Sequence, residues 1–279
     1  MELEKNTGAV PGIIPQEQRE QKRTERAEQK ARKSREKEAR RAQRRMEKYD
    51  RRTRQEEAAL EAPPVGKRPR GRLYTIGEEI FNAITHGAGA VLSIAALVIM
   101  TVMAVRSGSG AKLASAIVYG LTLVVLYTMS TLYHSIANRT AKKVLQVFDH
   151  CTIYLLIAGT YTPYTLVTLQ GTLGWTIFAA IWGLAALGVI LNAVDMKKFR
   201  VFSTILYPLM GWAIVAAFRP LAAALPPAGI WLLVAGGVAY TLGLIFYGLK
   251  KRRYMHSVWH LFVMAGSVLH FLSVVLYVL

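Results

Sequence analysis

From residue 88 onward the chain is a succession of apolar stretches separated by short polar connections. Each stretch is close to the ~20 residues that a helix needs to cross the hydrocarbon core of a bilayer. We place the stretches at 88–106, 113–134, 145–168, 173–193, 201–220, 229–249 and 256–278. The pattern predicts an all-α polytopic membrane protein built as a seven-helix transmembrane bundle. Pro163 and Pro208 fall inside predicted spans and are expected to kink them, which neighbouring helices in a membrane tolerate.

The first quarter of the chain has the opposite character. Residues 17–61 are dense in Arg, Lys, Glu, Gln and Ala and offer no apolar face, which predicts either a solvated charged helix or disorder. Prolines and glycines between residues 62 and 71 end that stretch. Residues 1–72 hold 22 of the 35 Lys and Arg residues and 13 of the 17 Asp and Glu residues. We therefore divide the chain into a basic arm, 1–72, and a transmembrane domain, 73–279.

The composition of the arm indicates what it binds. Its basic side chains are diluted by acidic ones, and apart from Tyr49 no aromatic residue lies among them, so we do not expect nucleic acid as a partner. A basic segment joined to a membrane domain favours the anionic headgroups of membrane lipids instead.

The charges in the predicted connections orient the bundle. With the amino terminus in the cytosol, ten basic residues lie in the inner connections and three in the outer ones. The inner set is Arg139, Lys142, Lys143, Lys197, Lys198, Arg200 and Lys250 to Arg253, and the outer set is Arg106, Lys112 and Arg219. Because basic residues are enriched in cytoplasmic loops, this bias predicts a cytosolic arm and a carboxyl terminus outside.

Ionisable side chains gather at the inner ends of the predicted spans. His256 and His260 are four residues apart, so a helix places both rings on one face, as in helical metal sites. His134 ends the second span, and Asp149 lies near the start of the third. Odd spans begin on the inner side and even spans end there, so all four side chains lie at one depth. Ionisable groups are costly in a membrane, which makes them candidates for function.

Three imidazoles with an open fourth position form the ligand set of a catalytic zinc ion. Asp149 is then a fourth ligand, holds a metal-bound water, or orients a histidine as an outer partner. Ser130 precedes His134 by one helical turn, so its hydroxyl is placed to bond that water, a substrate carbonyl or its own helix.

Other side chains have simpler interpretations. His270 lies ten residues beyond His260, about 15 Å along a helix, so both cannot bind one ion and we predict an interhelical hydrogen bond for His270. His150 and Cys151 are expected to pack or to support the site from outside. The chain has one cysteine, which excludes an internal disulfide and a Cys₄ zinc site. Taken singly, each histidine of the cluster could also be an interhelical hydrogen-bond partner.

Three segments resemble the signature motifs of the progestin and adipoQ receptor (PAQR) superfamily. They are Glu79-Ile-Phe-Asn-Ala-Ile-Thr-His86, Ser130-Thr-Leu-Tyr-His134 with Asp149 beyond it, and His256-Ser-Val-Trp-His260. The resemblance covers residues 75–279 and is strongest with the prokaryotic branch, the haemolysin III group. It implies a multi-pass protein of the bacterial inner membrane type.

The resemblance also implies roles for the residues of the motifs. The implied zinc ligands are His134, His256 and His260, with Asp149 contacting the zinc-bound water and Ser130 supporting the site. Glu79, Asn82 and His86 match the first motif, from which we expect support of the site. Eukaryotic relatives are similar to alkaline ceramidases, and bacterial members are linked to membrane-lipid homeostasis and carry a haemolysin name.

Three functions follow as hypotheses. The first is a zinc-dependent hydrolase of lipid amides or esters. The second is a membrane sensor or regulator in which zinc is structural. The third is a cytolytic pore former, which we rank last because the outer halves of the predicted spans consist almost entirely of Leu, Val, Ala and Ile.

Overall fold

A computed structural model describes residues 16–57, 74–249 and 252–279. The chain divides into two compact units, Met1–Arg70 and Gly71–Leu279. In the first unit the described residues form the helix α1 (Gln16–Glu57), which spans 42 residues. The stretch for which the sequence predicts a charged helix or disorder is helical over these described residues. An exposed pair, Arg32 Nε to Glu36 Oε1 at 3.3 Å, lies one turn apart along it, and such a pair stabilises a helix by only about 0.3–0.5 kcal/mol.

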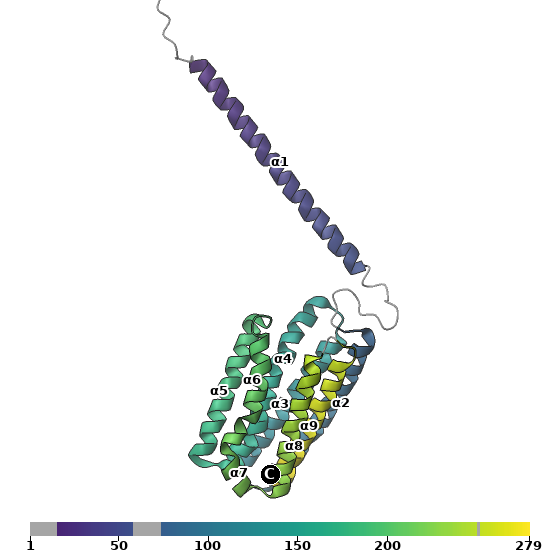
Figure 1. Cartoon of the computed structure of the whole chain (residues 1–279), viewed down its shortest axis with the longest axis vertical. Coiled ribbons are helices and arrows are strands. Elements are labelled where there is room, and N and C mark those ends of the chain that lie inside the picture. The colour runs from purple at the N-terminus through teal and green to yellow at the C-terminus, as the bar shows by residue number, and fades with distance from the viewer. Residues whose placement is uncertain (1–15, 58–73, 250–251) are drawn as a thin grey trace, which may run out of the picture. The chain divides into compact units, whose positions relative to one another are not determined.

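The second unit is a bundle of helices that run side by side (Figure 1). Its elements are α2 (Ile76–Arg106), α3 (Gly110–Ser135), α4 (Arg139–Pro163), the π-helical η1 (Tyr164–Leu169), α5 (Gly171–Asp195), α6 (Arg200–Trp212), the 3₁₀ turn η2 (Ala213–Ala217), α7 (Phe218–Ala224), α8 (Pro227–Gly248) and α9 (Met255–Tyr277). The contacts between neighbouring helices close a ring. In it, α2 contacts α3 and α9, and α3 contacts α4. Both α4 and α5 contact α6, α6 contacts α8, and α8 packs on α9.

Six segments of the described chain are long and apolar enough to cross a membrane. They are α2, α3, α5, α8, α9 and the combined stretch Arg200–Ala224. The predicted span at 145–168 corresponds to α4 and η1, which do not meet that measure. The reason is that α4 turns polar side chains, among them Asp149, Thr152 and Thr160, to the interior of the bundle, where they are buried.

The first helix begins earlier than its apolar stretch predicts. We expected the span to start at residue 88, but α2 starts at Ile76. Thr75 caps the helix and forms a capping box with Glu78, each side chain bonding the other residue's backbone N–H. The polar residues of the first motif therefore lie within the opening turns of α2 rather than before it.

Helix geometry changes near both prolines. Pro163 ends α4, and the chain continues as the π-helical η1. Pro208 lies inside α6, which passes into the 3₁₀ turn η2 five residues later. A proline removes a backbone donor from the helix ladder, and the altered turns that follow accommodate this loss.

Candidate metal centre

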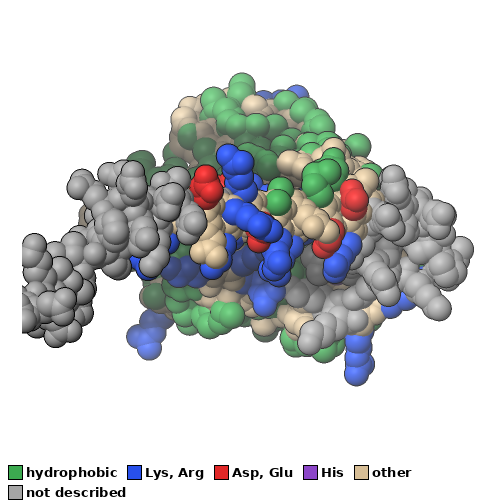
Figure 2. Space-filling model, turned by 90° about the horizontal axis from the view of Figure 1, so that it is seen from above, with side chains coloured by type: hydrophobic (Ala, Val, Ile, Leu, Met, Phe, Trp, Pro, Cys, Tyr) green, Lys and Arg blue, Asp and Glu red, His purple; other side chains and the backbone are tan. Residues whose placement is uncertain are grey.

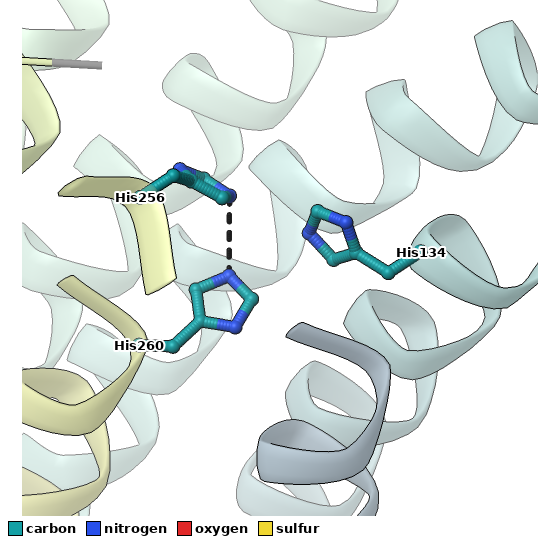
Figure 3. A group of neighbouring side chains, drawn as sticks. All are labelled: His134, His256 and His260. Atoms are coloured by element: carbon teal, nitrogen blue, oxygen red, sulfur yellow. Dashed lines mark hydrogen bonds between the residues drawn. The ribbon is translucent and has the colours of Figure 1, made fainter. Parts of the chain in front are cut away.

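Three buried imidazoles meet at the end of the bundle where α2, α4, α6 and α9 begin, which we call the site end. His256 and His260 lie one turn apart at the start of α9, with their Nε2 atoms 3.1 Å apart. His134 reaches the same place from the last turn of α3. One ligand atom from each ring lies within 4.8 Å of the others. Figure 3 shows the three rings turned toward one another.

The donor set fits a small metal ion. Zinc–nitrogen bonds of about 2.0–2.1 Å in tetrahedral geometry separate two ligating nitrogens by roughly 3.3 Å. The His256–His260 pair already has this spacing. His134 Nε2 is buried and has no hydrogen-bond partner among the residues that the structure describes, so its lone pair is available to an ion.

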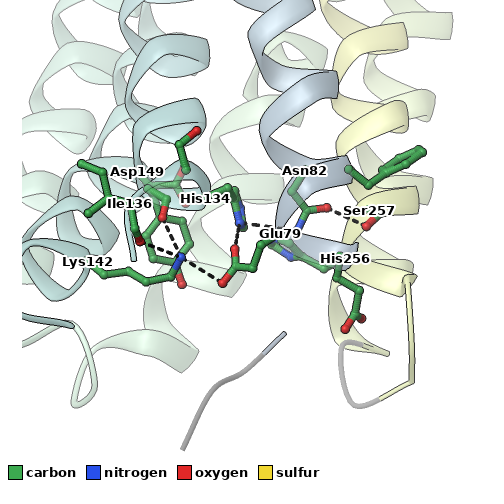
Figure 4. Close-up of polar contacts among 12 residues, drawn as sticks. Glu79, Asn82, His134, Ile136, Lys142, Asp149, His256 and Ser257 are labelled. Carbon is green, nitrogen blue, oxygen red and sulfur yellow. Dashed lines mark hydrogen bonds and ion pairs between the residues drawn. The ribbon is translucent and has the colours of Figure 1, made fainter. Parts of the chain in front are cut away.

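A carboxylate from α2 orients His134. Glu79 Oε2 accepts a hydrogen bond from His134 Nδ1 at 2.6 Å, and Glu79 Oε1 pairs with Lys142 Nζ of α4 at 2.9 Å (Figure 4). Because an ionised carboxylate only accepts hydrogen bonds, the proton lies on Nδ1 and leaves Nε2 free to bind. Lys142 Nζ also donates to the carbonyl of Tyr133 at 2.8 Å. The chain of contacts therefore joins α4, α2 and α3 around one ligand ring.

Ring stacking orients the two histidines of α9. Tyr74 lies flat on His256, with centroids 4.6 Å apart, and His86 lies flat on His260 at 3.6 Å. Burial raises the pKa of the Tyr74 phenol well above its usual range, so this side chain is neutral where it covers the site.

Two further residues of α2 connect that helix to α9. Asn82 accepts a hydrogen bond from Ser257 Oγ at 2.6 Å, and its Nδ2 lies 3.5 Å from His134 Nδ1. The buried carboxylate of Glu78 accepts bonds from the backbone N–H of Thr75 and of Tyr254, at 2.7 and 2.8 Å. Glu78 thus links the beginnings of α2 and α9.

Asp149 and Ser130 are buried near this cluster. Asp149 lies 3.6 Å from His150 Nδ1 and close enough to His134 for an electrostatic interaction. Among the described residues, the group whose ligand atoms lie within 4.8 Å of one another contains the three histidines and not Asp149. The geometry therefore favours the alternatives in which Asp149 acts beside the ligand set over the one in which it is a fourth ligand. Ser130 lies one turn before His134 on α3.

An apolar cavity of about 200 Å³ lies within the bundle beside the cluster. His86 and Asp149 line one end of it. Its walls come from α4, α6, η2, α7, α8 and α9 and are chiefly aliphatic and aromatic, with Ile157, Leu221 and Val263 as examples. Since Asp149 and Tyr164 both line it and are fifteen residues apart, it follows about 22 Å of helix.

The remaining polar residues of the bundle have structural roles. His270 Nε2 bonds the Leu233 carbonyl of α8 at 3.0 Å, which confirms the predicted interhelical bond. His150 bonds through its carbonyl to Tyr207, while Cys151 is a buried free thiol.

In the space-filling view of Figure 2, Lys and Arg side chains are visible together with Asp and Glu side chains, and no histidine is visible. This agrees with the burial of every histidine of the cluster.

Sequence reasoning missed Tyr74, Glu78, Lys142 and Ser257 as neighbours of the ligands. Ser257 lies in the third motif between the two candidate ligands His256 and His260, so its place in the sequence was a signal that it lies near the site. Glu78 and Glu79 are adjacent, and only the start of α2 decides which of them faces His134. Lys142 looked like one of several basic loop residues.

Comparison with known proteins identifies the family. Residues 74–271 match the family described as haemolysin-III related. The chain belongs to the haemolysin III family. Hemolysin-3 of Bacillus cereus is 47% identical over 204 residues, which cover 73% of this chain and 93% of that protein. The Hemolysin-3 homolog of Bacillus subtilis is 45% identical over 205 residues, which cover 74% and 96%.

A more distant relative connects this haemolysin III chain to eukaryotes. The monocyte to macrophage differentiation factor of Homo sapiens is 27% identical over 211 residues, 72% of this chain and 84% of that protein. Together these relatives confirm the haemolysin III group of the PAQR superfamily, as the three motifs predicted. Six apolar helices and bacterial relatives identify a multi-pass bacterial membrane protein. No solved structure matches the chain.

Proposed function

We propose that this haemolysin III protein is a zinc-dependent hydrolase of lipid amides or esters that acts in membrane-lipid homeostasis. The observation that carries the proposal is a buried three-histidine cluster beside a long apolar cavity, whose polar end is lined by Asp149 and by His86, the ring stacked on His260. The histidines supply a ligand set with an open position, and the cavity offers an apolar chain a place beside it.

In the proposed reaction, each side chain around the cluster has its own role. A bound zinc ion would supply Lewis-acid activation of water and of a carbonyl group. Asp149 accepts the proton of the attacking water and returns it to the leaving amine or alcohol as the carbon–nitrogen or carbon–oxygen bond breaks. Ser130 holds the water or the carbonyl oxygen by its hydroxyl. Glu79 keeps His134 in the tautomer that binds through Nε2.

The proposal also includes the membrane topology, that is, the number of spans and the side of the membrane on which the site lies. We infer that α4 with η1 is a seventh span, since it lies within the ring of helices between α3 and α5 and its polar side chains face inward. The bias of basic residues toward the site end then puts the arm and the cluster on the cytosolic side and the carboxyl terminus outside. A scissile bond near the inner headgroups is at the depth of the cluster.

The test is lipid cleavage by purified protein. Zinc-loaded protein in nanodiscs is incubated with ceramides and with acyl esters of several chain lengths, and released fatty acid is measured by mass spectrometry. Release that disappears after metal removal and returns with zinc supports the proposal. If the loaded protein cleaves none of these lipids while a ceramidase control does, the hydrolase proposal fails.

A second candidate is a sensor with structural zinc. It is favoured by the complete enclosure of His134, His256 and His260, none of which lines the cavity itself. A sensor would need the ion to fold but would not need Asp149 as a catalytic base. The Asp149→Asn variant of a sensor would therefore have the same effect in cells as the wild-type protein. The cytolytic pore is less compatible with the chiefly apolar cavity walls.

We propose anionic lipid headgroups as partners of the basic arm. Between Lys30 and Arg45 nine basic residues stand against two acidic ones, and the described side chains of α1 there are exposed. Attraction of such a segment to an anionic surface falls with ionic strength. Salt-dependent binding of the arm peptide to vesicles containing phosphatidylglycerol, and not to phosphatidylcholine vesicles, would support this partner; equal binding to both would exclude it.

A further inference from the structure

The polar end of the cavity holds a fourth histidine, which is not one of the three candidate ligands and whose ring nitrogens have no assigned role. His86, on α2, lines the cavity together with Asp149. Its side chain is 1% exposed. Neither ring nitrogen has a hydrogen-bond partner among the described residues. Buried polar atoms in proteins are nearly always bonded, so two open nitrogens on one ring call for an explanation.

Packing determines where this ring can bind. One face of His86 lies on His260, with centroids 3.6 Å apart and planes at 16°. The Tyr127 ring stands nearly perpendicular to it, at 5.0 Å. Parallel stacking occupies the face of the imidazole and leaves its nitrogens at the edge, so contact with His260 does not use their hydrogen-bonding capacity. His86 is therefore held in place by packing while its polar edge is unused.

We propose that His86 binds an oxygen atom of the head group of a chain-bearing lipid that occupies the cavity. A neutral imidazole has one donor and one acceptor, which suits a hydroxyl or a carbonyl oxygen at the end of an apolar chain. The remaining cavity wall is chiefly apolar, so the chain extends away from His86 toward Leu221 and Tyr164. This inference rests on the lipid class of the proposed function, which it deepens by naming the group that recognises the head.

The test uses ligands that hydrolysis cannot cleave. Affinities of 1-dodecanol and dodecane for zinc-loaded full-length protein in nanodiscs are compared by displacement of a fluorescent fatty acid. The two ligands differ by one hydroxyl group. Wild type should prefer the alcohol, and His86→Phe, which keeps a stacking ring without nitrogens, should lose about tenfold of that preference because one hydrogen bond is lost. Affinity for dodecane should stay unchanged.

Two further variants separate recognition from folding. His86→Gln retains a donor and should keep most of the preference for the alcohol. Tyr119→Phe removes a buried hydroxyl that does not line the cavity and should bind both ligands as wild type does. Zinc content is measured for each variant.

The outcomes distinguish this inference from the hydrolase proposal. If wild type shows no preference, if His86→Phe keeps it, or if both His86 variants lose zinc and ligand together, the inference is overturned. If the preference depends on His86 but no lipid is cleaved, the inference stands and the hydrolase proposal fails.

Discussion

Two groups of helices in the bundle differ in regularity. The regular helices carry the candidate metal ligands, and the interrupted helices form much of the cavity wall. α2, α3 and α9 run without interruption for 31, 26 and 23 residues and carry the ligand histidines with most of the side chains that orient them. The opposite wall is interrupted, because α4 passes into the π-helical η1 and α6 passes through the 3₁₀ turn η2 into α7.

This contrast separates two requirements of one site. An ion needs several atoms at fixed separations, and continuous helices tied by Glu78, Glu79 and Asn82 provide them. The acyl chain of the proposed lipid substrate needs a cavity of sufficient volume, and irregular helices can form the wall of such a cavity. Asp149 belongs to the interrupted wall but lies fourteen residues before Pro163, where α4 ends, so it shares the regular geometry of the site end.

The largest effect is expected when one of the candidate metal ligands on the regular helices is removed. His134→Ala should lower zinc affinity by more than about 100-fold, because it deletes one of three donors. Metal analysis of the purified protein measures this. His270→Ala is the matched control, since it removes a buried histidine from the same bundle. It should keep its zinc and cost about 1–3 kcal/mol of stability, because the bond to the Leu233 carbonyl is lost and a void replaces the ring. Zinc retained at wild-type level in His134→Ala would show that the cluster is not the metal site.

The next effect concerns turnover without metal loss. Asp149→Asn keeps the size of the side chain but removes the base, so fatty-acid release should fall by about 10²–10⁴-fold while zinc content is unchanged. The comparison of rate and metal content is the measurement. Unchanged release would assign Asp149 to packing and would favour the sensor.

A smaller effect is expected at the residues that orient His134. Glu79→Gln removes the carboxylate that holds Nδ1–H and should weaken zinc binding by about 10–100-fold. Lys142→Met, which leaves the carboxylate in place, should weaken it by less, roughly threefold. Competition with a zinc chelator gives both constants. The order would be reversed if Lys142, and not Glu79, were the main support of the ring.

The last prediction tests the interrupted wall, where the expected effect is below that of Glu79→Gln. Gly211 lines the cavity, and a Cβ added there meets no atom within 4 Å. Gly211→Leu should therefore fill the cavity and reduce cleavage of long-chain lipids roughly tenfold relative to short-chain ones. Gly89→Ala is the contrasting change on α2, because its Cβ would lie 2.5 Å from the Tyr127 ring. It should destabilise the bundle by about 1–3 kcal/mol and leave chain-length preference as it is, as thermal unfolding and a substrate series would show.

Much of this arrangement was accessible from the sequence. Helical spacing on α9 and the alternating direction of the spans brought His134, His256 and His260 together, because both follow from periodicity alone. The partners of those rings were not accessible, since contacts such as Lys142 with Glu79, or Tyr74 with His256, depend on how turns and rotamers place side chains from distant segments. The start of α2 was misjudged for a related reason: a capping box, and not hydropathy, sets it.

The order of the ligands along the chain has a consequence for biogenesis. His134 lies on α3, the second helix of the bundle, and the other two candidate ligands lie on α9, the last described helix. A nascent chain that has delivered only its first helices to the membrane holds a single imidazole, which is too few for tight capture of an ion. If the cluster binds a metal ion, the ion would be acquired only after insertion of α9, and a loaded centre would mark a chain whose assembly in the bilayer is finished.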